Sequence, residues 1–327
     1  MTAVVQDRYG TEPEAVLRTA RLARPRIGPR EVLVRVCASS VDRGTWHLMA
    51  GRPYAVRPVS GLRGPKLPNP GRSFAGVVES VGSEVTGFAP GDQVYGTAVA
   101  AFAEFAATRP DRIAPKPAGL TFEEAAAVPV SALTALQAVR DHGRVREGQS
   151  VLVTGASGGV GTFAVQLAHA LGARVTAVAS TAKLDAVRAL GADRVIDHTR
   201  EDCLAGPRGY DAVIDIAGNS RLRNLRRALT PRGRLVITGG EGDGAWLGGT
   251  DRQLRAQALS PFTTQHLGTF IASEHADGLR DLTALIDAGA LRPVVDRVFT
   301  LADTAAAVRH LLDGRHTGKV SLTLPAR

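Results

Sequence analysis

A glycine-rich segment near the middle of the chain has the residue types and spacing of a phosphate-binding turn. It follows the apolar stretch 151–154 and precedes a helical pattern at 159–171. Glycines at this spacing let a pyrophosphate approach the backbone, and the N–H groups at the helix start face the anion. An unliganded turn is the alternative. The residues expected to bind a dinucleotide here are Gly155, Ala156, Ser157, Gly158, Gly159, Val160 and Gly161.

The end of the next strand bears on the choice between NAD and NADP. A site for NAD usually carries an acidic residue about 20 residues after the turn, where it holds the ribose 2′-OH. The strand expected at 174–179 is followed by Ser180 and Lys183, with no acid between them. A hydroxyl and a positive charge suit a 2′-phosphate, although each residue alone could be a helix cap or a solvated lysine. Together with the missing acid they favour NADPH.

The composition narrows the class of protein. The chain has 327 residues, 44% of them apolar, which at about 150 residues per domain predicts two domains. The longest apolar runs fall well short of the ~20 residues of a bilayer span, so we expect no membrane association. The first residues lack a basic start followed by an apolar stretch, so we expect no signal peptide and a cytoplasmic protein.

The net charge of +9 does not by itself indicate nucleic acid. The basic residues are scattered, and aromatic residues do not alternate with them as stacking platforms would. We expect no nucleic-acid partner, and we expect the charge to help attract a phosphorylated cofactor. The two cysteines, Cys37 and Cys203, are too few for a disulfide scaffold or a four-cysteine zinc site. Free thiols are the expectation for both, and a single disulfide is the alternative.

The order of the expected elements predicts two folds in succession. Short β-branched runs at 31–36 and 76–81, bounded by Gly and Pro, and a further strand at 102–108 predict a β-rich first third. After Thr121, strands at 150–154, 174–179, 194–197, 212–216 and 234–238 alternate with helices at 159–171 and 182–190. Such alternation predicts a doubly wound parallel sheet with helices on both faces. Helices at 278–288 and 302–312 and a strand at 319–324 complete the α/β chain.

Five runs together resemble the medium-chain dehydrogenase/reductase superfamily, in its zinc-independent quinone oxidoreductase-like branch. They are 90–94, 131–135, 155–161, 190–193 and 318–320, which span nearly the whole chain. The resemblance implies a GroES-like catalytic domain at 1–121, a Rossmann NADPH-binding domain at 122–273 and a return segment at 274–327. It also implies an active site in the cleft between the two domains.

The resemblance assigns roles to further residues. Thr134 is expected on the nicotinamide side, and Gly239 and Gly240 end a strand beside the nicotinamide. His198 stands where many relatives carry a tyrosine, and it either stacks on the adenine or has an ordinary surface role. Residues 270–272, including Phe270 and Ile271, resemble the strand through which two cofactor domains pair, which implies a homodimer.

Two departures from related families bear on metal and substrate. Zinc alcohol dehydrogenases use a Cys and a His-Glu pair where this chain has 39–45 and 70–76, which contain neither, so we expect no metal. Many zinc-free relatives carry Asn-Pro where this chain has Asp42 and Arg43, and an acid where it has Ser73. Asp42 could hold the nicotinamide ribose, hold a water, or cap a turn.

Without a metal, hydrogen-bond donors must polarise the carbonyl group. Tyr54 matches a tyrosine near the nicotinamide in relatives and is the first candidate proton donor, with packing as its alternative role. Trp46 is expected to shape the pocket, and His47 is either a second donor or a structural residue. Basic residues at 52, 57, 63, 66 and 72 either favour an acidic substrate or lie on a solvated lid.

The function expected from these features is NADPH-dependent reduction of quinones or α,β-unsaturated carbonyls by hydride transfer. A conjugated substrate suits a metal-free site because its negative charge spreads onto an oxygen able to carry it. The alternatives are a pathway-specific ketone or aldehyde reductase, a non-redox enzyme on the same fold, and an NADPH-binding protein without turnover.

Overall fold

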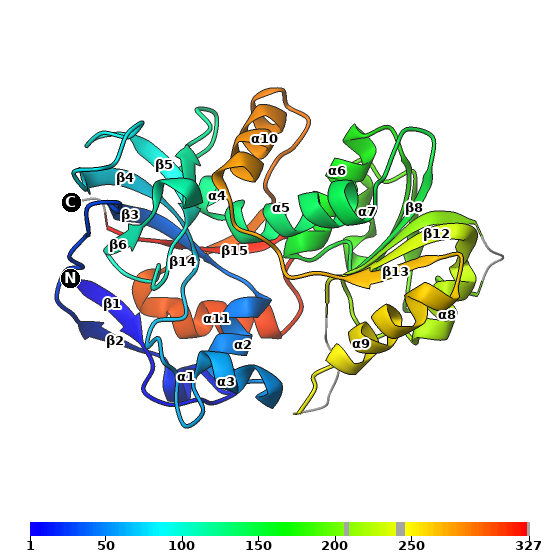
Figure 1. Ribbon diagram of the computed structural model, residues 1–327, viewed down its shortest axis with the longest axis horizontal. Coiled ribbons are helices and arrows are strands. Elements are labelled where there is room, and N and C mark those ends of the chain that lie inside the picture. Colours follow the sequence, from blue (N-terminus) through cyan, green and yellow to red (C-terminus); the bar gives the residue numbers. More distant parts are fainter. Residues whose placement is uncertain (206–208, 240–245, 326–327) are drawn as a thin grey trace. The chain divides into compact units, whose positions relative to one another are not determined.

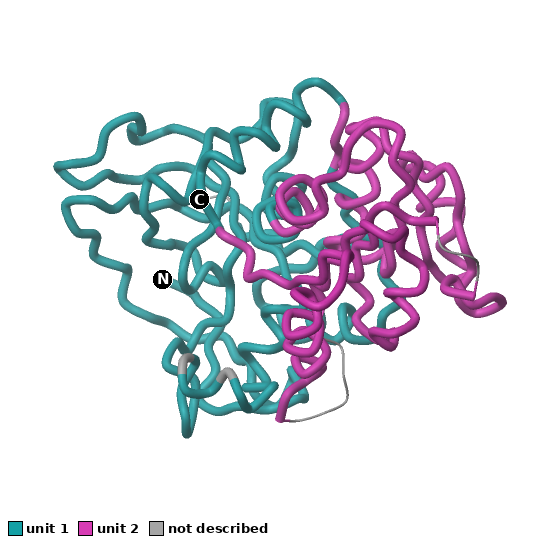
Figure 2. Tube along the Cα trace, turned by 45° about the vertical axis from the view of Figure 1, so that its right-hand side comes forward, with its two compact units in different colours: residues 1–133, 274–289, 293–327 teal, residues 134–273, 290–292 magenta. Residues whose placement is uncertain are grey.

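The computed structural model of the chain describes residues 1–205, 209–239 and 246–325 (Figure 1). The chain forms two compact units (Figure 2). Unit 1 comprises residues 1–133, 274–289 and 293–327, and unit 2 comprises residues 134–273 and 290–292. The division falls between Leu133 and Thr134, later than the expected boundary at 121/122. The helix that begins after Thr121 therefore belongs to the β-rich unit.

Unit 1 is built on a seven-stranded sheet. Its strands are β3 (Val32–Val41), β4 (Ser73–Val81), β5 (Gln93–Thr97), β6 (Phe105–Thr108), β7 (Ile113–Pro115), β14 (Val295–Thr300) and β15 (Lys319–Thr323). The order is β14-β15-β3-β4-β5-β7, and β6 pairs with β3. All pairs are antiparallel except β14 with β15. A separate pair, β1 (Thr2–Val5) and β2 (Arg18–Arg21), was not expected from the sequence.

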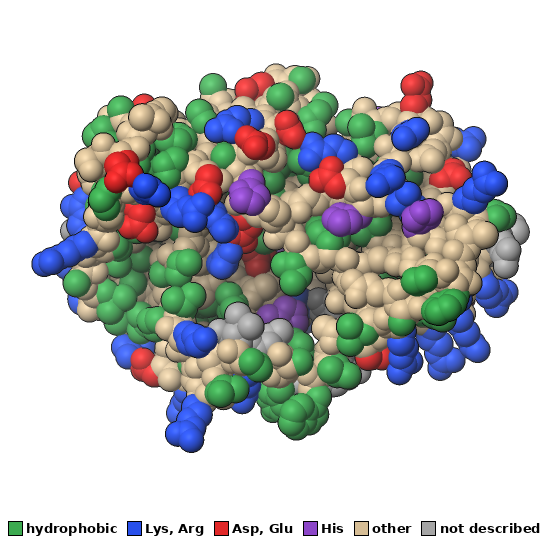
Figure 3. All heavy atoms as spheres, viewed as in Figure 1, with side chains coloured by type: hydrophobic (Ala, Val, Ile, Leu, Met, Phe, Trp, Pro, Cys, Tyr) green, Lys and Arg blue, Asp and Glu red, His purple; other side chains and the backbone are tan. Residues whose placement is uncertain are grey.

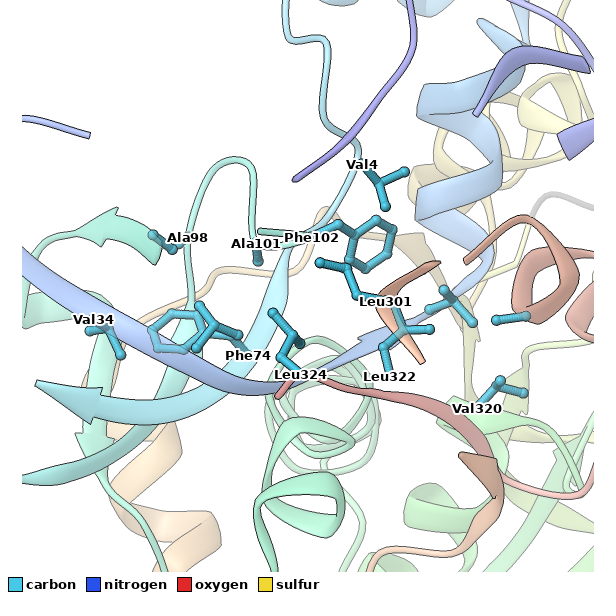
Figure 4. Close-up of a cluster of buried hydrophobic side chains, with 14 of the residues drawn as sticks. Val4, Val34, Phe74, Ala98, Ala101, Phe102, Leu301, Val320, Leu322 and Leu324 are labelled. Atoms are coloured by element: carbon cyan, nitrogen blue, oxygen red, sulfur yellow. The ribbon is translucent and has the colours of Figure 1, made fainter. Parts of the chain in front are cut away.

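Short helices accompany this sheet. They are α1 (Pro13–Val16), α2 (Arg43–Ala50), α3 (Arg57–Ser60), α4 (Phe122–Ala126), α10 (Ala276–Asp287) and α11 (Thr304–Leu312). Figure 4 shows part of the core, which includes Phe74 of β4, Phe102 and Leu322 of β15. All three side chains are fully buried. Burial of each such side chain contributes roughly 1.5–3 kcal/mol, so this cluster is the main stabilising element that holds α2 and β15 in place.

Unit 2 contains the expected doubly wound sheet. Six parallel strands run in the order β10-β9-β8-β11-β12-β13. They are β8 (Ser150–Thr154), β9 (Arg174–Ala179), β10 (Arg194–Asp197), β11 (Tyr210–Asp215), β12 (Leu229–Ile237) and β13 (His266–Thr269). The strand order reverses between β8 and β11. In sheets of this kind, ligands bind outside the carboxyl ends of the strands at that reversal.

Helices cover both faces of the unit 2 sheet. In Figure 1, α6 (Gly159–Ala170) and α7 (Leu184–Arg188) lie above the sheet, and α8 (Leu222–Ala228) and α9 (Thr250–Leu259) lie below it. The helix α5 (Pro129–Leu136) continues into a wider turn at Gln137–His142. The helix expected at 182–190 is shorter than predicted and covers only α7 (Leu184–Arg188). Lys183 ends a preceding 3₁₀ turn at Thr181–Lys183, and its backbone is not α-helical.

In the part of the chain that the structure describes, no helix is both long enough and apolar enough to cross a bilayer.

Candidate active site

The glycine-rich turn lies where the strand order of unit 2 reverses. It connects the end of β8 to the start of α6. Gly155 has a φ of +65°, and a Cβ at this position would lie 2.9 Å from the Ala217 nitrogen. A Cβ on Gly161 would lie 2.1 Å from the Gly155 carbonyl oxygen. Only glycine fits at both positions, so the turn and the first turn of α6 come into direct backbone contact.

The helix start itself is suited to an anion. Gly158 is the N-cap of α6 and offers no side chain to the free N–H groups of the first turn. Ser157, Gly159 and Val160 are half-buried there, and Ala156 is fully buried with its N–H donated to Val178 at 3.1 Å. Unsatisfied N–H groups and the positive end of a 12-residue helix together attract a phosphate group. The residues present therefore fit the pyrophosphate of a dinucleotide.

A buried ion pair stabilises the carboxyl ends of the strands beneath the glycine-rich turn. Asp215, at the end of β11, is fully buried, and its carboxylate lies 2.8 Å from an Arg252 Nη atom and accepts from Thr154 Oγ1 at 2.7 Å. Burial raises the pKa of Asp215, and the Arg252 charge acts against that rise. The Thr154 hydroxyl also accepts from the N–H groups of Ile216 and Ala217. The ends of β8 and β11 are thus tied together beneath the turn.

Arg252 joins this pair to two further loops. Its guanidinium donates to the Ser220 carbonyl at 2.7 Å and to the Gly239 carbonyl at 3.2 Å. A Cβ on Gly239 would lie 2.0 Å from the Ile216 carbonyl oxygen, so this position also requires glycine. Sequence reasoning missed both Asp215 and Arg252. The signal for Asp215 was an acid at the end of an apolar strand, whereas Arg252 lies 37 positions later on a helix and carried no signal.

The residues expected around the 2′-phosphate lie at the end of β9. Ser180 precedes the 3₁₀ turn, and its carbonyl accepts from the Lys183 N–H at 2.9 Å. Both side chains are half-buried. The neighbouring strand adds a group that the sequence did not indicate. Asp197, at the end of β10, accepts from the hydroxyls of Thr181 at 2.5 Å and Thr199 at 2.7 Å.

Asp197 remains ionised at neutral pH. Hydrogen bonds from Thr181 and Thr199 lower the pKa of this carboxyl to about 2. Arg200 Nε lies 3.5 Å from its Oδ2 atom. The carboxyl end of β10 therefore carries a negative charge, which the two threonine hydroxyls stabilise. This charge lies one strand away from Ser180, at the end of β9.

The other cofactor-side residues are spread over unit 2. Thr134 is half-buried in α5, and His198 is exposed directly after β10. Gly240 lies outside the described residues. Within the single chain, β13 ends at Thr269, and residues 270–272 pair with no strand of the described chain. Phe270 instead stacks on His142, with ring centroids 4.2 Å apart, and Ile271 is 97% exposed.

In unit 1, Asp42 is a helix cap. One carboxylate oxygen accepts from the Thr45 N–H at 3.0 Å, and the Thr45 hydroxyl accepts from the Asp42 N–H, which forms a reciprocal capping box for α2. The other oxygen is buried 4.0 Å from Lys319 Nζ. Of the three roles considered for Asp42, these contacts match the cap.

Lys319 is fully buried beside this cap. Its ammonium group donates to the Val41 carbonyl at 3.0 Å. Burial lowers the pKa of Lys319, and the nearby Asp42 carboxylate acts against that fall. The pair therefore fixes the end of β15 to the junction of β3 and α2. Lys319 belongs to the run 318–320, which resembles the family, and these contacts explain why a lysine stands there.

His47 is positioned by its Nδ1 atom. That atom lies 2.9 Å from the Arg52 carbonyl oxygen, which can only accept a hydrogen bond. Nδ1 therefore carries the proton, and in neutral His47 the Nε2 atom is an acceptor. The ring of Trp46 meets the His47 ring edge-on at 5.0 Å, and Trp46 packs against the core of unit 1.

Tyr54 begins the 3₁₀ turn Tyr54–Val56 and lies against arginine. The Arg57 guanidinium carbon is 4.4 Å from the Tyr54 ring centroid and 4.8 Å from that of Tyr9. Arg57 Nε also donates to the Gly51 carbonyl at 2.9 Å, and Arg52 approaches Tyr54 at 5.9 Å. Two guanidinium groups therefore accompany the candidate donor.

Serines occupy the regions that hold zinc ligands in zinc alcohol dehydrogenases. Ser39, Ser40 and Ser73 are fully buried. The Ser39 and Ser40 hydroxyls donate to main-chain carbonyls, and the Ser73 hydroxyl accepts from the Val130 N–H. Across residues 1–205, 209–239 and 246–325, no three His, Cys, Asp or Glu side chains gather so as to hold a metal ion. Cys37 and Cys203 are free and half-buried, and burial raises the pKa of both thiols.

Two family models match the chain. A model described as an alcohol dehydrogenase GroES-like domain matches residues 28–138, and one described as a zinc-binding dehydrogenase matches residues 190–322. The first lies mainly on the strands of unit 1, and the second covers much of the unit 2 sheet and the return to unit 1.

Individual proteins are similar over almost the whole chain. The spectinabilin polyketide synthase system protein NorB of Streptomyces orinoci is 36% identical over 97% of this chain, which spans only 14% of that protein. The quinone oxidoreductase of Mus musculus is 30% identical, with 95% of each chain covered.

Among solved structures, the quinone oxidoreductase from Coxiella burnetii has a TM-score of 0.88 at 28% identity, with 99% of each chain covered. Sequence and fold thus agree over both units. The chain belongs to the medium-chain dehydrogenase/reductase superfamily, in its quinone oxidoreductase-like branch.

Proposed function

We propose that the protein is an NADPH-dependent oxidoreductase that reduces a quinone or an α,β-unsaturated carbonyl compound. The observation that carries this proposal is the glycine turn at the strand-order reversal of unit 2, where a Cβ at Gly155 or Gly161 would collide with backbone. Such a turn has a specific use in binding a dinucleotide pyrophosphate. The family membership supports the redox class of the reaction.

The cofactor would be held by residues of unit 2. Backbone N–H groups at 159–161 bind the pyrophosphate, and Ser180 and Lys183 bind the 2′-phosphate. The Asp197 carboxylate is already engaged by two threonine hydroxyls and Arg200. We therefore assign it to holding the turn after β9 in place, and not to binding a ribose hydroxyl. Thr134 and Gly239 flank the nicotinamide, and Arg252 fixes the Gly239 carbonyl. When bound, NADPH supplies the hydride.

Unit 1 would supply the proton. Tyr54 is the preferred donor, because its phenol is an O–H donor and two arginines lie against its ring, where positive charge stabilises a developing phenolate. The Nδ1 atom of His47 faces the Arg52 carbonyl, so the neutral ring presents an acceptor at Nε2. His47 is therefore the weaker candidate donor.

A quinone and an unsaturated carbonyl compound share the feature that this site needs. In both, the hydride goes to an electrophilic carbon, and the negative charge moves to a conjugated oxygen without a metal. One relative is named a quinone oxidoreductase, which supports the first kind of substrate.

We also propose a homodimer formed through unit 2. The strand β13 lies at the edge of the sheet, with one side unpaired in the described chain. Near it, Ile271 is 97% exposed and Phe262 is 87% exposed. Exposed apolar side chains beside an open edge strand are typical of a protein interface. Sedimentation of wild type and of Ile271→Asp tests this: we expect a dimer for the first and a monomer for the second, and a monomeric wild type contradicts it.

The test of the proposed activity is the rate of NADPH loss with quinones, enones and simple aldehydes, with and without a chelator. Rapid loss with quinones or enones that is insensitive to the chelator supports a metal-free reductase. Loss only with simple aldehydes favours a ketone or aldehyde reductase. Tight NADPH binding without any loss contradicts the proposal and favours a binding protein or a non-redox enzyme.

A further inference from the structure

An arginine-lined pocket lies on unit 2, away from the residues assigned above. Its volume is about 420 Å³, and it is lined by Arg223, Arg226, Arg227, Pro231, Thr263, Thr264 and Gln265. The three arginines come from α8, at positions i, i+3 and i+4, which places them on one face of the helix. The remaining residues come from the start of β12 and from the segment just before β13.

The base of this arginine pocket is rigid. Gln265 is buried, and its amide group donates to the carbonyls of Arg226 at 2.9 Å and Thr230 at 3.3 Å. The same side chain accepts from Arg226 Nε at 3.3 Å, which orients one guanidinium group. The Thr264 hydroxyl donates to the Pro231 carbonyl at 2.5 Å and closes the rim. The Arg226 guanidinium group is therefore held in place before any ligand arrives.

The charges in the arginine pocket are not balanced. None of its seven lining residues is acidic. Within the described residues, Arg223 and Arg227 have no carboxylate partner, whereas Arg188 pairs with Asp185 and Arg280 pairs with Asp277. Figure 3 shows blue side chains gathered at the lower right, in the region where Figure 1 labels α8. Like charges at this helical spacing repel one another, so a bound anion would remove a cost that the protein now carries.

The arginine pocket is separate from the proposed dinucleotide site. The glycine turn follows the carboxyl end of β8, and Asp215 and Gly239 lie at the carboxyl ends of β11 and β12. Pro231 and Thr263–Gln265 instead lie at the amino ends of β12 and β13. Because all six strands are parallel, these two groups of residues lie at opposite ends of the strands.

We propose that the arginine pocket binds a soluble, compact polyanion of the phosphate type, such as pyrophosphate or a small organic phosphate. Guanidinium groups form paired hydrogen bonds with phosphate oxygens, and the Thr263 hydroxyl, which accepts from the Gln265 N–H, has its own proton to donate. The pocket volume of about 420 Å³ is in the range of small-molecule sites, so a small ligand fits it better than a protein surface does. The site is independent of NADPH and of the reaction proposed above.

The experiment is calorimetric titration with inorganic pyrophosphate at fixed ionic strength. Four proteins are compared: wild type, Arg223→Gln/Arg227→Gln, Lys183→Ala, and Arg188→Gln/Arg280→Gln. The second double variant removes the same charge from two exposed arginines that have carboxylate partners. We expect the pocket variant to weaken binding at least tenfold, and the other two to bind as wild type does. Equal binding by both double variants overturns the proposal, as does equal weakening of both.

Hydrogen exchange locates the bound pyrophosphate, because the glycine turn is itself a candidate for this probe. We expect slower exchange at 221–228 and 263–267 in wild type and no such change in Arg223→Gln/Arg227→Gln. Slower exchange confined to 155–161 would assign the pyrophosphate to the dinucleotide site alone and overturn the proposal. If sodium chloride at the same ionic strength slowed exchange at these residues equally, the effect would be charge screening only, and this would also overturn the proposal.

Discussion

In unit 2 the candidate cofactor residues are held mainly by main-chain geometry, whereas in unit 1 the candidate catalytic residues depend on contacts that their side chains make. Gly155, Gly161 and Gly239 are fixed by backbone atoms that leave no room for a Cβ. Tyr54 and His47 are instead placed by Arg57, Trp46 and the Arg52 carbonyl. A binding site defined by backbone can be read from glycine spacing, and a site defined by side-chain partners cannot.

The largest effect is expected from breaking the one buried ion pair that supports the backbone-defined site. Arg252→Met leaves the Asp215 carboxylate buried without its charged partner, which typically costs about 3–5 kcal/mol. We expect a correspondingly lower free energy of unfolding by urea denaturation, together with weaker NADPH binding. Arg255→Met, on the same helix but exposed, is the control. Equal stability of the two variants would contradict the supporting role.

A Cβ in the turn should abolish cofactor binding with a smaller loss of stability. In Gly161→Val, the side chain collides with the Gly155 carbonyl and separates the turn from α6. We expect NADPH affinity to fall by about 100-fold or more, since the pyrophosphate contacts depend on that close approach. Gly268→Ala is the control, because a Cβ there meets nothing within 4 Å. Fluorescence titration with NADPH measures both.

The choice of cofactor is tested by Lys183. Loss of a charge-assisted hydrogen bond costs about 1.5–3 kcal/mol, so Lys183→Ala should weaken NADPH binding roughly 10- to 100-fold. NADH binding should remain nearly unchanged, because NADH has no 2′-phosphate. Arg188→Ala, a nearby exposed cation, is the control. Equal losses for both cofactors would remove the assignment.

On the side of unit 1, Tyr54→Phe should reduce kcat by about 100-fold, at the lower end of the range that general acid catalysis contributes. NADPH affinity should stay as in wild type, because the change removes one hydroxyl group and keeps the ring against Arg57. Steady-state kinetics with the best quinone or enone substrate measures this. An unchanged kcat would assign Tyr54 to packing.

The smallest effect concerns pH. The pKa of Asp197 is lowered to about 2, so its stabilising contribution is present above the unfolded value near 4 and is lost as pH falls towards 2. We expect the Tm of wild type to fall over that interval by more than the Tm of Asp197→Asn, which has already lost the contribution. Parallel Tm curves for the two proteins would contradict this.

The regular part of the fold follows from local sequence patterns. The strands at 150–154, 174–179 and 194–197 were predicted with the bounds found, because each is a short apolar run between turn residues. The pair β1 and β2 was missed, since each strand has only four residues and neither shows a clear alternation. Residues 270–272 follow the end of β13, and Phe270 stacks on His142 there.

The chemistry of single residues follows less well from the sequence. The cap at Asp42 was one of three open roles, and the contact with Lys319, far along the chain, was not foreseen. The pairing of Asp215 with Arg252 depends on where α9 packs, which no local pattern states. Long-range partners of charged side chains are decided by the tertiary fold.

The most direct test of the account is the transfer of label from NADPH to product. NADPH deuterated at C4 of the nicotinamide, separately on each face, is incubated with the protein and an enone, and the product is examined by NMR. The account predicts deuterium on the electrophilic carbon of the product from one labelled face only. Product without deuterium from either face would contradict hydride transfer by this protein.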